Sequence, residues 1–67
     1  MTSQTMNKCL RASRRYRNKG LRCIQQGLSE TDQGKKDNLA LYAQMYFRQA
    51  RHFDEMIMNY IKEEAER

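Results

Sequence analysis

The chain is short and basic, with 67 residues, a formal net charge of +5 and a hydrophobic fraction of 39%. One domain of this size buries only just enough apolar surface to offset the chain entropy lost on folding. The two cysteines are too few for a disulfide framework, and the chain has no tryptophan and no proline. No apolar run approaches the roughly 18 residues that cross a bilayer, and the first residues lack a leader pattern. We therefore expect one soluble, cytoplasmic domain without membrane contact that gains stability by forming a homodimer.

Charge is distributed unevenly along the chain. Residues 1–36 carry nine basic and two acidic side chains, whereas residues 37–67 carry four basic and six acidic ones. A basic first half predicts an acidic partner, which is either nucleic acid or an acidic protein surface. The positive charge gathers on one face of the first predicted helix, and this basic face comprises Lys8, Arg11, Arg15, Lys19 and Arg22.

The first helix is predicted over about residues 3–28. Thr2 and Thr5 lie among several side chains that could cap its start. Cys9 and Cys23 are fourteen residues apart, which is about 21 Å along a continuous helix and too far for a disulfide. Both are therefore expected to be reduced thiols. One face of this helix is apolar or small, and it carries Met6, Cys9, Leu10, Ser13, Tyr16, Gly20, Cys23, Ile24 and Gly27.

Gly20 leaves two alternatives for this helix. Glycine often ends helices and costs about 1 kcal/mol inside one, so the helix could break near Gly20. The other alternative is a continuous helix to about Leu28. In that case the small residues Ser13, Gly20 and Gly27, spaced seven apart, would let a partner helix approach closely.

The connector is predicted over about residues 29–37, which contain no large apolar side chain. The second helix then runs over about residues 38–64, capped by Asp37 or Asn38, with Thr31 or Asp32 as candidates for an earlier start. Its apolar residues alternate in steps of four and three, which is a heptad pattern that needs another helix to pack on. This heptad seam comprises Leu39, Ala43, Tyr46, Ala50, Phe53, Ile57 and Tyr60.

The fold class expected from these elements is all-α, an antiparallel two-helix hairpin that forms a dimeric helical bundle. Glu63 and its acidic neighbours lie where the helix dipole disfavours negative charge. An antiparallel arrangement would place them beside Lys8 and Arg11, which favours that orientation.

Apolar side chains extend beyond the heptad seam. They indicate either a broad core face in a small bundle or an adaptable docking surface, because methionine repacks easily against varied partners. The candidate partner-binding residues on the second helix are Met45, Phe47, Met56 and Met58.

No catalytic or metal-binding pattern is present in the sequence. His52 is the one histidine, and Asp54 two residues later falls on a different helix face. The two cysteines lack further ligands at zinc spacing, and the three glycines match no phosphate-binding loop. We therefore expect no enzyme activity and no cofactor.

Scattered positions resemble a known family. Ala12-Ser13, Tyr16 and Gly20 in the first helix, with Asn38, Tyr42-Ala43 and Tyr46-Phe47-Arg48 in the second, resemble the ANR family of small negative regulators of AraC-type transcription activators. The resemblance covers about residues 8–50. It implies a helical protein that binds the activator itself, and also nucleoid proteins, rather than a promoter. It also implies that the apolar face of the first helix binds the partner, through Leu10, Leu21, Ile24 and Leu28.

The function expected is inhibition of an AraC-type activator by protein–protein interaction. Two alternatives stay open. The basic face could bind nucleic acid directly, with affinity that falls steeply with salt. The chain could instead be a small secretion chaperone.

Overall fold

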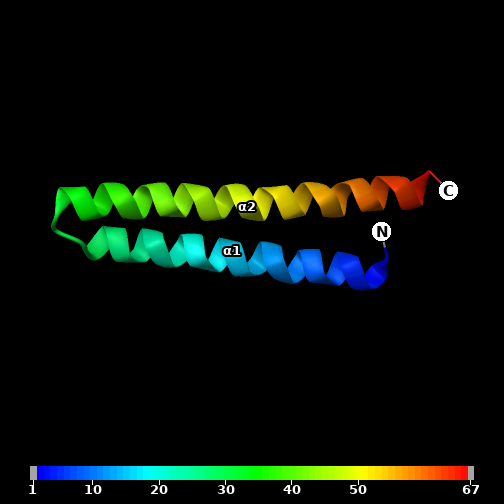
Figure 1. Cartoon of the computed structure of the whole chain (residues 1–67), viewed down its shortest axis with the longest axis horizontal. Helices are drawn as coiled ribbons and strands as arrows, with labels where there is room; N and C mark the ends of the chain where they lie inside the picture. Colours follow the sequence, from blue (N-terminus) through cyan, green and yellow to red (C-terminus); the bar gives the residue numbers. More distant parts are fainter. Residues whose placement is uncertain (1, 67) are drawn as a thin grey trace.

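The structure, a computed structural model, describes residues 2–66 as two long helices joined by a short turn (Figure 1). Helix α1 spans Ser3–Ser29 and helix α2 spans Gln33–Ala65. They lie side by side and antiparallel, both termini lie at one end, and the Cα trace measures 53 × 16 × 11 Å (Figure 1). The predicted all-α hairpin is therefore confirmed, with no strand in the described residues. Neither of these helices is apolar enough along its length to span a membrane.

Helix α1 starts where the sequence predicts and passes through Gly20 without a break. The Thr2 side chain caps it by accepting a hydrogen bond from the Thr5 backbone N–H at 3.1 Å. No glycine in residues 2–66 has a positive φ, so the alternative of a break at Gly20 is wrong. Gly20 is buried instead, against the ring of Phe47 on α2. A Cβ at this position would lie 2.8 Å from the Phe47 ring, so the close helix contact favours glycine here.

The connector is shorter than predicted and comprises only residues 30–32. Helix α2 begins at Gln33 because Asp32 caps it, accepting a hydrogen bond from the Lys35 backbone N–H at 3.0 Å. The Glu30 carboxylate accepts hydrogen bonds from the backbone N–H groups of Thr31 and Asp32, each at 3.1 Å, and fixes the turn. The predicted connector over residues 29–37 is therefore too long, and the alternative of an earlier start capped by Asp32 is confirmed.

Small side chains form the centre of the interface between the helices. Ser13 and Gly20 of α1, with Ala43 and Ala50 of α2, are all buried, and Ala50 is only 1% exposed. Their short side chains bring the two backbones close together. All seven residues of the predicted heptad seam are buried or half-buried, so its assignment as the face that packs on α1 is confirmed.

The register of the hairpin is set by two contacts. Ser13 donates a hydrogen bond to Asp54, and Gly20 lies against Phe47. Continued to the open end, this register places Glu63 opposite Gln4. Lys8 lies about one turn further along α1, and within residues 2–66 no ion pair joins Glu63 to Lys8 or Arg11.

Candidate partner-binding surface

The hairpin has two long sides where side chains of both helices meet, and aromatic rings occupy one of them. The Tyr16 ring stacks on Phe53 with centroids 5.8 Å apart and on Tyr46 with centroids 6.3 Å apart. The Lys19 ammonium lies 5.7 Å from the centroids of both tyrosine rings. We call this side the tyrosine flank, and it comprises Tyr16, Lys19, Leu39, Tyr42, Tyr46, Phe53, Met56 and Tyr60.

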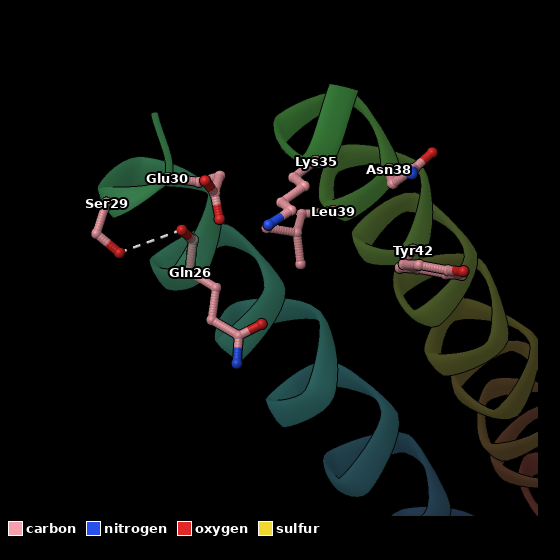
Figure 2. Close-up of a pocket in the computed structure, with 7 residues that line it drawn as sticks. All are labelled: Gln26, Ser29, Glu30, Lys35, Asn38, Leu39 and Tyr42. Carbon is pink, nitrogen blue, oxygen red and sulfur yellow. Dashed lines mark hydrogen bonds between the residues drawn. The ribbon is translucent and has the colours of Figure 1, made fainter. Parts of the chain in front are cut away.

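Near the turn, the tyrosine flank contains a shallow groove. Figure 2 shows Lys35 and Leu39 of α2 reaching toward α1, where Gln26 and Glu30 line the other side. At the end of α1, Ser29 donates a hydrogen bond to the Gln26 backbone carbonyl at 3.2 Å (Figure 2). The groove is lined by mixed polar and apolar groups and contains no cluster of like charges.

The opposite side is the leucine flank, where few side chains cross between the helices. Arg17 donates a hydrogen bond to the Asp54 carboxylate at 2.6 Å, and Phe47 lies against Gly20. Near the turn, Ile24 and Leu28 of α1 line a groove with residues of α2. By helical spacing the leucine flank comprises Leu10, Arg14, Arg17, Leu21, Ile24 and Leu28 of α1 and Ala40, Gln44, Phe47, Arg51, Asp54, Met58 and Ile61 of α2.

Most of the large apolar side chains that the hairpin leaves exposed lie on the leucine flank. Of nine such side chains in residues 2–66, six are on this flank, among them Leu21 at 47% and Leu28 at 81% exposed. Larger apolar patches on a small soluble domain indicate binding sites more often than scattered single residues do. The six are Leu10, Leu21, Ile24, Leu28, Met58 and Ile61.

The structure brings together some of the residues predicted to bind a partner and separates others. The four residues predicted on α1 lie on one flank with Met58, with Leu10 and Met58 toward the open end and the other three toward the turn. Met45 is exposed, but it lies on the outer face of α2, and Met56 is half-buried on the tyrosine flank. Phe47 is half-buried, and a Cβ built on Gly20 would lie 2.8 Å from its ring, which fits the alternative of a broad core face for this residue.

Sequence reasoning missed one member of the exposed set, Ile61, which is 53% exposed. Its spacing of three residues from Met58 continues the steps of three and four along α2 and could have revealed it. Leu41 and Tyr42 are also exposed but lie away from the leucine flank. The predicted basic face is exposed along its whole length, and its residues are Lys8, Arg11, Arg15, Lys19 and Arg22.

Groups that could carry covalent or metal chemistry are dispersed in the hairpin. His52 is exposed, with its ring 5.6 Å from that of Phe53. Both cysteines are free thiols, Cys9 buried and Cys23 half-buried. Within residues 2–66 no three His, Cys, Asp or Glu side chains lie close enough together to hold a metal ion.

The geometry therefore offers one feature that stands out, an exposed aliphatic surface running along both helices. The surface has no deep cavity, which is typical of sites that bind a protein rather than a small molecule. Comparisons with known protein families, with curated proteins and with solved structures find no match for this chain.

Proposed function

We propose that the chain is a small regulator that binds an AraC-type transcription activator through its leucine flank and inhibits it. The single observation that supports this is the gathering of six exposed large apolar side chains on one side of the hairpin. The resemblance to the ANR family supplies the class of partner. Binding and inhibition would then require no catalysis and no cofactor.

The mechanism proposed is occupancy of a surface that the activator needs. Burying exposed aliphatic groups of both proteins would supply most of the free energy of binding. The covered surface of the activator would be one used for its own dimerisation or for contact with DNA. Such a regulator would act in the cytoplasm, where two free thiols stay reduced.

Copurification with the activator, with nuclease present, tests this function. Leu21→Asp places a charge among the aliphatic side chains of the leucine flank near the turn, so binding should be lost while the protein stays helical by circular dichroism. Met45→Asp is the matched control, because Met45 is 58% exposed but lies on the outer face of α2. Unchanged binding of Leu21→Asp would contradict the proposal.

A second candidate function is direct nucleic-acid binding by the exposed basic face. A mobility shift that weakens steeply with salt, and that disappears on exchanging Arg11, Arg15 and Arg22 for glutamate, would favour this function. The regulator should give no such shift at physiological salt. The homodimer and the contact with a nucleoid protein stay predictions, which sedimentation and the same copurification can check.

A further inference from the structure

The leucine flank carries a second heptad pattern on each helix. On α1, Leu10, Arg14, Arg17, Leu21, Ile24 and Leu28 follow one another in alternating steps of four and three. On α2, the steps of four and three continue from Ala40 to Ile61. A stripe with this spacing accommodates another helix along its length. From Leu10 to Leu28 it extends about 27 Å, at 1.5 Å per residue.

The middle of the leucine flank is charged, whereas its exposed aliphatic side chains lie at the two ends, with Lys36 at the edge of the groove near the turn. Arg14 and Arg17 interrupt the stripe on α1, and Arg51 lies at the same level on α2, in a groove it lines with Phe47. Asp54 is the one carboxylate on the flank, and it pairs with Arg17 at 2.6 Å. Within residues 2–66 neither Arg14 nor Arg51 has a carboxylate within 4.0 Å. The centre of the flank therefore carries two positive charges that the hairpin does not neutralise.

This charge pattern disfavours a second copy of the chain as the occupant. In a two-fold symmetric dimer that covered the whole flank, the centre of one copy would face the centre of the other. Arg14 and Arg51 would then meet the same residues of the second copy, and facing like charges oppose association. A partner with carboxylates at this level would instead neutralise the two arginines.

We propose that the leucine flank binds an amphipathic helix of another protein, with carboxylates in the middle and large aliphatic residues at both ends. This inference rests on the proposed function, for which it names the chemistry of the partner surface. The aliphatic ends contact the two apolar regions of the flank. The central Asp or Glu side chains pair with Arg14 and Arg51, which fixes the position of the partner helix along the hairpin.

Two designed peptides test the chemistry of the partner. Each is an amphipathic helix of about three heptads with leucines at the core positions of the two outer heptads. One peptide has glutamates in its middle heptad and the other has lysines at the same positions. By fluorescence anisotropy at moderate salt, the glutamate peptide should bind at least about tenfold more tightly.

A charge reversal in the protein should reverse this preference. The double variant Arg14→Glu, Arg51→Glu should bind the lysine peptide more tightly and leave the Arg17–Asp54 pair in place. Arg11→Glu, Arg22→Glu is the matched control, because it makes the same change in net charge on the exposed basic face. This control should retain the preference for the glutamate peptide.

Equal binding of both peptides, or loss of the preference in the control, would overturn the inference. So would a dimer of the chain alone that dissociates on Leu21→Asp, because a second copy would then occupy the flank.

The proposed function can fail independently of this inference. If the glutamate peptide binds as expected but an AraC-type activator does not copurify, the partner chemistry holds and the activator is wrong. If the activator copurifies and the peptides show no preference, the proposed function holds and the proposed chemistry of the partner surface is wrong.

Discussion

The two flanks of the hairpin join the same pair of helices with different side chains. On the tyrosine flank, the ring of Tyr16 bridges to Tyr46 and Phe53, and all three rings are half-buried. On the leucine flank, the contacts between the helices include the hydrogen bonds of Asp54 with Ser13 and Arg17 and the packing of Phe47 on Gly20. Aliphatic side chains such as Leu21 extend into solvent. The tyrosine flank therefore holds the two helices together, and the leucine flank leaves apolar surface exposed to solvent.

This difference assigns stability to the tyrosine flank and partner binding to the leucine flank. Stacked aromatic rings bury a large area and add favourable ring contacts, so the tyrosine flank should contribute most of the stability outside the buried seam. Side chains that stay exposed in the free hairpin contribute little to its stability. The leucine flank can therefore carry large apolar groups whose burial is available to a partner. The predictions that follow compare the two flanks, beginning with the largest expected effect.

Ala50→Leu should disrupt both flanks together. Ala50 is 1% exposed at the centre of the helix interface, so a larger side chain must push the helices apart. We expect a loss of about 3 kcal/mol in the free energy of unfolding, measured by urea denaturation. Ala40→Leu, at an exposed position on the leucine flank, is the control and should change stability little. Equal effects of the two substitutions would contradict the close packing at Ala50.

Truncation of one side chain on each flank compares them directly. Phe53→Ala removes a half-buried ring that stacks on Tyr16, and it should cost about 2 kcal/mol. Leu21→Ala removes a side chain that is 47% exposed, and it should cost less than about 1 kcal/mol. The midpoints of urea denaturation measure both changes. A larger loss for Leu21→Ala would reverse the assignment of stability to the tyrosine flank.

Asp54→Ala should destabilise the leucine flank through Ser13. The Ser13 hydroxyl is buried and donates to Asp54, so removal of the carboxylate leaves a buried donor without its acceptor. We expect a loss of about 1 to 2 kcal/mol. Arg17→Met removes only the half-exposed ion pair and should cost less than about 1 kcal/mol. Combining Ser13→Ala with Asp54→Ala should recover part of the loss, and no recovery would contradict the role of Ser13.

Gly20→Ala should show the smallest effect, and its sign should depend on Phe47. Alanine favours a helix over glycine by about 1 kcal/mol, but its Cβ would lie 2.8 Å from the Phe47 ring. In a Phe47→Ala background the clash is absent, so Gly20→Ala should stabilise the hairpin by up to about 1 kcal/mol. In the wild-type protein the gain should be smaller or reversed. Thermal unfolding of the four proteins measures this coupling, and strictly additive effects would contradict it.

Much of the fold is predictable from the sequence because helices obey local rules. The apolar spacing from Leu39 to Tyr60 predicted which face of α2 packs on α1, and caps near Thr2 predicted where α1 begins. The start of α2 was less predictable. Asp32 and several later polar residues are all suitable caps, and the sequence does not rank them.

The candidate surface was only partly predictable. Leu10, Leu21, Ile24 and Leu28 share a stripe that periodicity alone defines, and Met58 was also identified. For Phe47 and Met56 the sequence left a core face and a docking surface as alternatives, because their burial depends on the neighbouring helix. Gly20 leaves space that the Phe47 ring occupies, and this contact is invisible within the sequence of α2 alone.

Residue spacing alone specifies two amphipathic helices, the heptad seam that joins them and a basic outer face. The tertiary structure decided which apolar residues outside the seam lie together. Helical periodicity places a residue on a face of its own helix, but the register and the antiparallel direction decide which residues of the other helix lie beside it. Contacts such as Ser13–Asp54 and Gly20–Phe47 set that register. They place Met58 and Ile61 on the same flank as Leu10 and leave Met45 outside it.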